Sequence, residues 1–378
     1  MKISRRKFIG STAASIALAP TVFNADAHAE LAPSDIDWGM GFPEGATLLN
    51  RNENPIGPSA KAIEAAKIGI EKSFRYADSI LIKKLLSEHH DIPEDHIIVG
   101  VGSGEILNIM PLVYMQDSGS SMIALRESYR PIPGRAQRLG GEVKWVNLLP
   151  EENYQFNVDR LLNAVDDNTK LLFLVTPNNP TGAVMSYDDV KRLADGLPDH
   201  TKLIVDGAYR DFQEDGRDEI DLIKNGNKNI LVTRTFSKIY AMAGLRAGYG
   251  IAHPDIIKEL SKFGGSPTST NMAGFGAMAA SLGDMDHVRK SREFIGKART
   301  YYETEFDKLG IAHLAGPTNF FLAETGENTV QIANELRRRK IFVRAGGEWG
   351  MPNHTRISYG LDHENEIYFK ALKEIIGG

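Results

Sequence analysis

The sequence predicts an α/β fold in which a large, mostly parallel sheet is covered by helices and a smaller α+β domain follows it. Three observations support this prediction. From about residue 76, short β-rich runs alternate with segments of helical periodicity. The run Leu171–Val175 is apolar throughout, which requires cover on both faces of its strand. The last hundred residues lose the alternation and begin with a long helical stretch.

The strands predicted for the large domain come first along the chain. They are His96–Val101, Ser121–Leu125, Glu142–Val146, Lys170–Thr176, Lys202–Val205, Asn229–Thr233 and Leu245–Ile251. Segments with apolar residues at i, i+3 and i+4, such as Ile106–Met115 and Tyr187–Leu197, lie between most of them and predict helices. A cluster of Gly, Ser, Thr and Asn at Ser269–Gly276 predicts a hinge after the last strand.

The smaller domain is predicted from a helix at Met285–Leu309, a strand at Asn319–Ala323 and a helix at Asn328–Lys340, with short strands near Phe342 and Arg356. The predicted organisation is a signal peptide at 1–29, an arm with part of the small domain at 30–75, the large domain at 76–275 and the small domain at 276–378.

The composition excludes several classes of protein. Among 378 residues, 44 Lys and Arg stand against 49 Asp and Glu, and this net charge of −5 offers no basic surface for nucleic acid. A hydrophobic share of 42% is ordinary for globular chains and excludes general disorder. The chain has no cysteine, so it can form no disulfide, thiolate nucleophile or cysteine-based zinc site. No metal is expected, because the adjacent histidines in Glu88–Asp91 point in different directions on a predicted surface helix.

The first 29 residues predict a twin-arginine export signal. Ser4–Ile9 contains an arginine pair, an apolar run from Ile9 to Phe23 follows, and Ala27–Ala29 offers a small-x-small cleavage site. The alternative is a frayed N-terminal helix with an accidental arginine pair. The signal predicts a periplasmic or secreted protein, and no other apolar stretch is long enough to predict a membrane anchor.

A lysine directly after a predicted buried strand is the strongest chemical signal. Lys238 ends the segment Thr235-Phe236-Ser237-Lys238, and Arg246 follows between glycines. Burying an ammonium is costly unless it is paired or neutralised, whereas an imine with an aldehyde cofactor removes that cost. Thr235, Ser237 and Arg246 offer hydroxyls and a fork-shaped cation suited to a phosphate dianion. Alone the pattern is weak, because most lysines are solvated surface groups.

Three other segments strengthen this hypothesis. Thr176–Gly182 ends a strand at the edge where open α/β sheets bind ligands, although alone it is a Pro/Asn/Gly turn. Asp206 ends the next strand, where a carboxylate is either a helix cap or a partner for a cationic ring. Val99–Glu105 runs from strand into helix, and the free N–H groups there make a phosphate cradle.

In this order, the segments resemble the fold-type I, class I/II pyridoxal-phosphate aminotransferases, in particular the histidinol-phosphate aminotransferase branch. The resemblance runs from Asn50–Pro55 through Arg75–Asp78 to Thr355–Ser358 and covers nearly the whole chain after the predicted signal. It implies the fold-type I architecture, pyridoxal 5'-phosphate as cofactor, and ping-pong Schiff-base transfer of an amino group between an amino acid or related amine and a 2-oxo acid. It also implies a homodimer with shared active sites, in which Tyr76 reaches the phosphate of the partner subunit's site.

The resemblance implies a role for each matching residue. Lys238 is implied to form the Schiff base and then to act as general base and acid, and Asp206 to pair with the pyridine nitrogen. Asn179 and Tyr209 are implied to hydrogen-bond the phenolic oxygen of the cofactor. Tyr129 is implied to stack on the ring, with a core tyrosine as the alternative. The residues implied to hold the phosphate are Gly102, Ser103, Gly104, Thr235, Ser237 and Arg246.

The substrate side is less specific. Arg356 lies where the family binds the anionic group of the substrate, which is a carboxylate or a phosphate. Arg344 matches a second arginine that some members use for the distal anion, with a solvated arginine as the alternative. Asn54 is the third residue expected to bind substrate. The chain departs from the usual pattern at Gly207, where the family has Glu, and such departures near the site leave the donor unassigned.

Two other functions stay open from the sequence. A decarboxylase or lyase with the same cofactor would differ only in which bond stands perpendicular to the imine plane, and its products would reveal it. An exported, non-catalytic binding protein on an inherited scaffold is the second alternative, because fold alone does not guarantee function.

Overall fold

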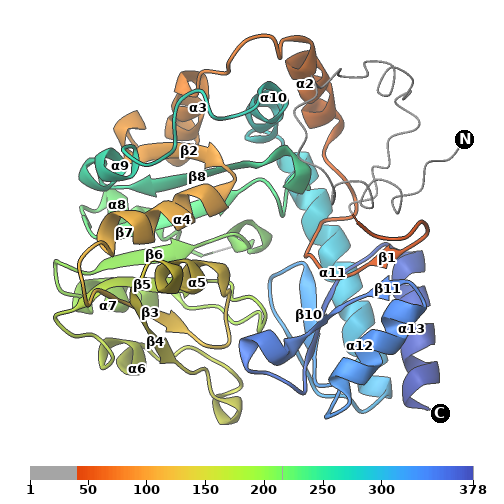
Figure 1. The fold of residues 1–378 in the computed structure, drawn as a ribbon. Coiled ribbons are helices and arrows are strands. Elements are labelled where there is room, and N and C mark those ends of the chain that lie inside the picture. Colours follow the sequence, from red (N-terminus) through yellow and green to blue (C-terminus); the bar gives the residue numbers. More distant parts are fainter. Residues whose placement is uncertain (1–40, 215, 378) are drawn as a thin grey trace, which may run out of the picture. The chain divides into compact units, whose positions relative to one another are not determined.

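A seven-stranded sheet forms the centre of the larger part of the fold (Figure 1). In the computed structural model, residues 41–377 apart from 215 are described, so the predicted export signal lies outside them. The strands are β2 (Ile97–Val101), β3 (Ser121–Leu125), β4 (Glu142–Val146), β5 (Thr169–Val175), β6 (Lys202–Asp206), β7 (Ile230–Thr235) and β8 (Ala247–Ala252). Their order is β2-β8-β7-β6-β5-β3-β4, and β8 runs antiparallel to both neighbours while the other neighbours are parallel. All seven predicted strands are therefore present in one sheet.

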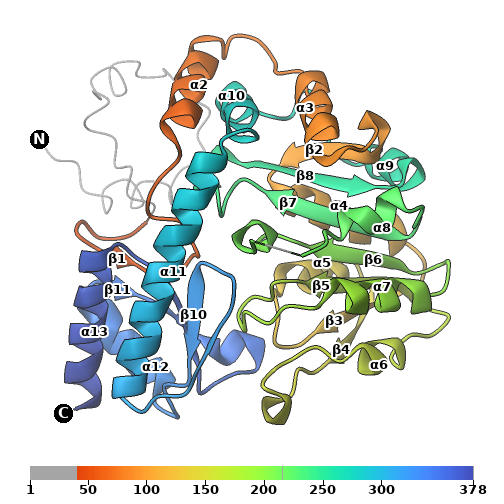
Figure 2. The same ribbon diagram turned by 180° about the vertical axis from the view of Figure 1, so that it is seen from behind.

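Helices cover both faces of this sheet. They are α4 (Ser103–Tyr114), α5 (Pro131–Arg138), α6 (Val158–Leu162), α7 (Tyr187–Gly196), α8 (Ile220–Lys224) and α9 (Pro254–Leu260). Helices α4 and α5 lie over one face, and α6, α7 and α8 lie over the other (Figures 1 and 2). Along β5, Leu171 and Phe173 pack into one core whereas Leu172 and Leu174 pack into the other. This two-sided burial explains why the strand is apolar throughout.

A second, four-stranded antiparallel sheet is built from the last part of the chain. Its strand order is β12 (Arg344–Ala345), β13 (Thr355–Ser358), β10 (Phe320–Ala323) and β9 (His313–Ala315). The accompanying helices are α11 (Met285–Lys308), α12 (Thr329–Arg338) and α13 (Asp362–Ile376). Near them, β1 (Thr47–Leu48) pairs in parallel with β11 (Ile341–Phe342), which ties the start of the described chain to its C-terminal part.

The predicted hinge is wrong over most of its length. Asn271 caps α10 (Met272–Ser281) by accepting from the backbone N–H of Gly274, so the segment is helical from Met272 onward. Helix α10 packs closely on α2 (Ala60–Glu71): a Cβ at Gly276 would lie 2.5 Å from the carbonyl oxygen of Ala65. Gly276 has no side chain and therefore allows the two helices to cross closely. In the sequence alone, the same glycine is part of a pattern typical of a flexible segment.

The remaining elements are short or connect the two sheets. They are α3 (Ile80–His90) and the 3-10 turns η3 (Glu94–His96), η4 (Pro150–Glu152), η5 (Arg210–Phe212), η6 (Ala243–Leu245) and η7 (Gly346–Trp349). Within α3, His90 is half-buried and its Nε2 lies 2.8 Å from the hydroxyl of Tyr249, so the expected surface helix has one inward-facing histidine.

The fold class is thus α/β, with a mostly parallel sheet under helices and a smaller α+β part, as the sequence predicts. The chain from Gly45 onward packs as one compact unit, and the domain boundaries near residues 75 and 275 stay predictions. Within the described residues, no helix combines the length and apolar character needed to cross a membrane.

Candidate active site

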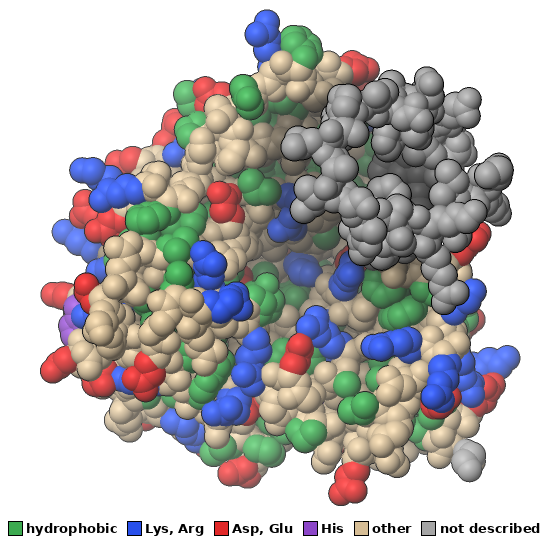
Figure 3. Space-filling view, viewed as in Figure 1, with side chains coloured by type: hydrophobic (Ala, Val, Ile, Leu, Met, Phe, Trp, Pro, Cys, Tyr) green, Lys and Arg blue, Asp and Glu red, His purple; other side chains and the backbone are tan. Residues whose placement is uncertain are grey.

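The carboxyl ends of β5, β6 and β7 meet at a cavity of about 290 Å³. Parallel strands bring their C-terminal ends to one edge of a sheet, and for that reason residues far apart in sequence gather there. The predicted residues that line it are Ser103, Gly104, Tyr129, Asn179, Asp206, Tyr209, Thr235, Ser237, Lys238, Arg246, Arg344 and Arg356. Lys and Arg side chains gather in and around the hollow near the middle of the face shown in Figure 3.

Lys238 follows β7 by three residues, and its amine lies inside this cavity. Its Nζ donates to the carbonyl oxygens of Asn52 and Arg51, at 2.8 and 3.2 Å. Burial, together with the positive charge of Arg356, lowers the pKa of Lys238 to about 8. At neutral pH an appreciable fraction of this amine is unprotonated, so it can act both as a nucleophile and as a proton carrier.

Asp206 ends β6 and is 4% exposed. Its Oδ1 accepts from the backbone N–H of Ala208 at 3.1 Å and from the hydroxyl of Thr233 at 3.3 Å. Burial raises the pKa of Asp206 to about 6, and these hydrogen bonds oppose the rise. A carboxylate held in so dry a place is stabilised by a cationic partner, such as a protonated ring nitrogen.

Replacing Asp206 with asparagine is expected to stabilise the cofactor-free protein above pH 6. The folded pKa of about 6 lies above the ordinary value of 3.8, so between these values the folded state binds more protons than the unfolded state. The free energy of unfolding of the wild-type protein therefore falls as pH rises through this window, by at most about 3 kcal/mol. Urea unfolding of both proteins at pH 4 and pH 8 measures it. A difference in unfolding free energy that is the same at both pH values would contradict the argument.

Hydrogen bonds connect the cavity floor to the N-terminal segment. Asn52 donates from Nδ2 to the hydroxyl oxygen of Tyr209 at 2.9 Å, and its own backbone N–H donates to Ser358 Oγ at 2.8 Å. Burial raises the pKa of Tyr209 to about 12, which keeps the phenol protonated. Tyr209 therefore keeps a hydroxyl proton that it can donate toward the cavity.

The start of α4 and the end of β7 form a phosphate-shaped cradle. The first N–H groups of an α-helix have no intrahelical partner, and those of Ser103 and Gly104 lie at this start. Gly102 has φ 78°, and a Cβ there would lie 2.6 Å from Nη2 of Arg246, so only glycine fits. The hydroxyls of Thr235 and Ser237 lie 3.0 Å apart beside them. Two hydroxyls, one guanidinium and a helix N-terminus suit a phosphate dianion.

The acid that follows this cradle has a local structural partner. Glu105 accepts the backbone N–H of Val101 at 2.6 Å through Oε2, and its Oε1 accepts the N–H of Gly265 at 3.3 Å. Its carboxylate therefore caps the end of β2 and does not line the cavity.

Arg356 is a buried cation that lines the same cavity. It is 3% exposed and donates from Nη1 to Asn179 Oδ1 and from Nη2 to the carbonyl of Asn50, both at 2.7 Å. Its Nε is buried without a protein partner. Burial lowers the pKa of Arg356 to about 10, and the nearby Arg344 contributes. The guanidinium keeps its positive charge at neutral pH, and among residues 41–377 apart from 215 it forms no ion pair with a carboxylate. A cation of this kind suits an anionic group.

Three predicted residues do not line the cavity. Gly102 lies behind the head of Arg246, as described above. The amide of Asn54 donates to the carbonyl oxygen of Ile239 at 3.2 Å and to Ser291 Oγ at 3.1 Å. Ile239 directly follows Lys238 in the sequence. Tyr76 is 87% exposed on the surface of its own chain. Their assigned roles, like those of the lining residues, stay predictions.

The sequence analysis missed Arg51 and Asn52, which also line the cavity. Asn52 adopts φ 53°, an uncommon conformation for a residue with a side chain, in which Asn is enriched. It lies in the segment Asn50–Pro55 that carries the family resemblance, where Asn54 was singled out instead. Only the folded chain shows which of the two asparagines faces Tyr209.

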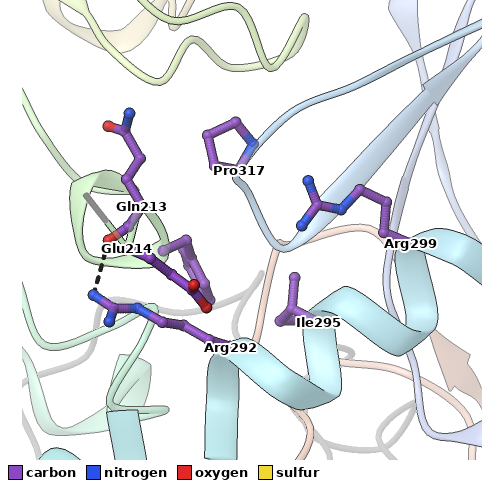
Figure 4. Close-up of a pocket in the computed structure, with 7 residues that line it drawn as sticks. Gln213, Glu214, Arg292, Ile295, Arg299 and Pro317 are labelled. Atoms are coloured by element: carbon purple, nitrogen blue, oxygen red, sulfur yellow. Dashed lines mark hydrogen bonds between the residues drawn. The ribbon is translucent and has the colours of Figure 1, made fainter. Parts of the chain in front are cut away.

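A second hollow lies apart from these residues. It is lined by Phe212, Gln213, Glu214, Arg292, Ile295, Arg299 and Pro317 (Figure 4). Arg292 of α11 reaches across to donate to the carbonyl of Gln213 at 2.8 Å. No predicted site residue lines this hollow, and Arg292 connects α11 to the segment at and after η5.

Comparison with known proteins identifies the family. Residues 44–371 match the family described as aminotransferase class I and II. The chain belongs to this family. It is 32% identical over 345 residues to a histidinol-phosphate aminotransferase of Symbiobacterium thermophilum, covering 91% of this chain and 94% of the relative. The solved histidinol-phosphate aminotransferase of Sinorhizobium meliloti in complex with pyridoxal-5'-phosphate is 26% identical, with a TM-score of 0.81 over 88% of this chain and 91% of its own. The expected family and fold type are confirmed.

Proposed function

We propose that this aminotransferase, whose cofactor is pyridoxal 5'-phosphate, takes an amino donor with an anionic group that Arg356 binds. The observation that carries the proposal is the single cavity shared by Lys238, Asp206, the phosphate cradle and Arg356. When bound, pyridoxal phosphate withdraws electrons from the donor carbon that carries the amino group. The residues present fit this cofactor, because an amine, a buried carboxylate and a phosphate cradle surround one space.

Each residue then has a distinct task. With the cofactor bound, Lys238 Nζ would take up the proton from the donor carbon and then donate it to the bound cofactor. Its pKa of about 8 allows both protonation states near neutral pH. The Asp206 carboxylate would pair with the protonated ring nitrogen of the bound cofactor. Tyr209 would donate a hydrogen bond from its protonated hydroxyl to the phenolic oxygen of the cofactor. Arg356 binds the donor's anion and so orients the reacting carbon toward Lys238.

The donor anion is a carboxylate or a phosphate. A guanidinium binds both in a bidentate manner, and the relatives described above are named histidinol-phosphate aminotransferases. A neighbouring cavity of about 490 Å³, which shares Arg344 and Arg356 with the first, gives room for the donor side chain and includes Arg130 and Arg138. These cations favour donors with a further anionic or polar end.

The experiment is a spectral titration of purified protein loaded with pyridoxal phosphate. Donors are L-glutamate, L-aspartate, L-histidinol phosphate and, as the uncharged comparison, L-histidinol. We expect an anionic donor to remove the visible absorption band and a 2-oxo acid to restore it, with L-histidinol inactive. Release of carbon dioxide or ammonia without a 2-oxo product would instead indicate a decarboxylase or lyase. An unchanged band with every donor would favour a binding protein.

We also propose that the protein is a homodimer with shared active sites. Apolar side chains lie exposed on α2 and just after it, including Ile70 at 62% and Phe74 at 78%. Tyr76 is more exposed still and lines none of the cavities described above, which suits a contact with a second copy. Such a run of apolar surface is typical of an interface.

The dimer is tested by sedimentation of wild type and of Phe74→Glu. We expect a dimer for wild type and a shift toward monomer, with weaker binding of pyridoxal phosphate, for the variant. The control is Phe263→Glu, which changes an exposed phenylalanine on a different part of the chain. A wild-type monomer with full activity would contradict the proposal.

Finally, we propose that residues 1–29 direct twin-arginine export to the periplasm or the medium. The support is the sequence alone, with its arginine pair, apolar run and cleavage site. Replacing both Arg5 and Arg6 with lysine is expected to retain the protein in the cytoplasm, which cell fractionation measures. Mass spectrometry of the exported wild type would locate the cleavage site, and unprocessed cytoplasmic wild type would refute export.

A further inference from the structure

A fully buried arginine lies behind the active-site edge of the sheet. Arg234 is 2% exposed and lies on β7 between Thr233 and Thr235. Thr233 donates to Asp206 and Thr235 lines the active-site cavity. Since successive side chains on a strand point to opposite faces, Arg234 leaves the strand on the far face of the sheet. It lines none of the cavities described above.

The guanidinium of Arg234 has partners on three sides. Nη2 donates to Asp218 Oδ1 at 2.7 Å and to Glu219 Oε2 at 3.0 Å. Nη1 donates to the carbonyl oxygen of Thr233 at 3.1 Å. The two carboxylates hold the pKa of Arg234 above its ordinary value in spite of burial. A buried cation is stable only when it is paired, so these three hydrogen bonds oppose any movement of the guanidinium.

That position is the space that a side chain at residue 207 would occupy. A Cβ built on Gly207 would lie 1.9 Å from Nη1 of Arg234 and 2.7 Å from its Cζ. The Thr233 carbonyl accepts from the backbone N–H of Gly207 at 3.1 Å as well as from Arg234. The guanidinium of Arg234 and the turn at Gly207 therefore share the Thr233 carbonyl oxygen as acceptor and pack directly against each other.

The turn that contacts this guanidinium carries two active-site groups. Asp206 precedes Gly207, and Tyr209 follows it by two residues. Within the turn, the N–H of Ala208 donates to the Asp206 carboxylate, and the N–H of Arg210 donates to the Gly207 carbonyl at 3.0 Å. A displacement at Gly207 would therefore move the carboxylate and the phenol together.

We propose that Arg234 is a positioning residue of the aminotransferase: its guanidinium, packed against Gly207, fixes the turn that holds Asp206 and Tyr209 in the cavity. The proposal rests on the proposed function, because it assigns a role within that reaction. Arg234 does not line the active-site cavity, so its packing acts on the cavity through the turn. Its positive charge also favours the ionised form of Asp206, against the effect of burial.

The test is a double-mutant cycle in the protein loaded with pyridoxal phosphate. Gly207→Ala places a methyl group against the guanidinium, and Arg234→Met removes the guanidinium. We expect each variant to lower kcat at least tenfold, with less than a threefold change in the donor KM, because Arg356 lies on a different strand. We expect the kcat of the double variant to lie within twofold of the kcat of the less active single variant, since both substitutions disrupt the same contact between Gly207 and Arg234.

A spectroscopic readout separates positioning from loss of fold. The pH midpoint of the visible absorption band is expected to move by at least 0.5 unit in both single variants, because the band reports the surroundings of Lys238 and Asp206. Glu219→Gln keeps the shape of the partner and is expected to give a smaller change of the same sign. The control is Gly283→Ala, whose added Cβ meets no atom within 4 Å, and it should leave kcat and the midpoint unchanged.

Two outcomes would overturn the inference. The first is that Gly207→Ala and Arg234→Met both have the kcat and the spectral midpoint of the wild-type protein. The other is effects that add in full in the double variant, which would mean that the two residues act separately. Failure of the proposed function looks different: wild type itself would keep its band unchanged with every donor, whereas the spectral midpoints of the variants would still report on the turn.

Discussion

Lys238→Ala is expected to lower kcat for transamination about 10²–10⁴-fold, because proton transfer by one positioned group contributes that much. The variant loses the only lysine amine that lines the described cavity, together with its hydrogen bonds to Asn52 and Arg51. The phosphate cradle remains, so pyridoxal phosphate still binds, but it can be removed by dialysis. Steady-state kinetics and the absorption spectrum before and after dialysis measure both effects.

Lys262→Ala is the matched control, because Lys262 is exposed and does not line the cavity. It should retain wild-type kcat and a visible band that survives dialysis. A Lys238→Ala protein with more than a tenth of wild-type kcat would show that another group transfers the proton.

Arg356→Gln is expected to lower kcat/KM for anionic donors about 10²–10³-fold. Losing one partner of a buried, hydrogen-bonded charge pair costs 2–5 kcal/mol, which corresponds to this range. The change should appear mainly in KM, since the role proposed for Arg356 is to bind the donor and not to transfer protons. Steady-state kinetics with several donors measures it, and an uncharged donor should be affected much less.

Arg344→Gln provides the comparison, because the Arg344 side chain is 47% exposed and already pairs with Glu348 at 2.7 Å. Exposed ion pairs contribute about 0–1 kcal/mol, so we expect less than a tenfold loss in kcat/KM. A larger loss for Arg344→Gln than for Arg356→Gln would reverse the two assignments and place the donor anion in the neighbouring cavity.

Local patterns in the sequence were enough to predict the strands of the large sheet and the polar groups at their ends. Each of the seven strands of the large sheet was predicted within a few residues, because hydrophobic runs and the turn residues that bound them are local signals. Lys238, Asp206 and Asn179 were found for the same reason. Each follows an apolar strand, and the ends of parallel strands meet at one edge of the sheet.

Which polar residues face each other depends on the folded chain. Asn52 contacts Tyr209 across 157 positions of sequence, and nothing local distinguishes it from Asn54. Met272–Gly276 became helical because α10 packs on α2, which overrides the glycines. At Gly207, the guanidinium of Arg234 occupies the volume that a side chain would need, and this contact is visible only in the folded chain. Local periodicity is determined by neighbours in sequence, whereas close packing and the pairing of buried charges depend on residues that folding alone brings together.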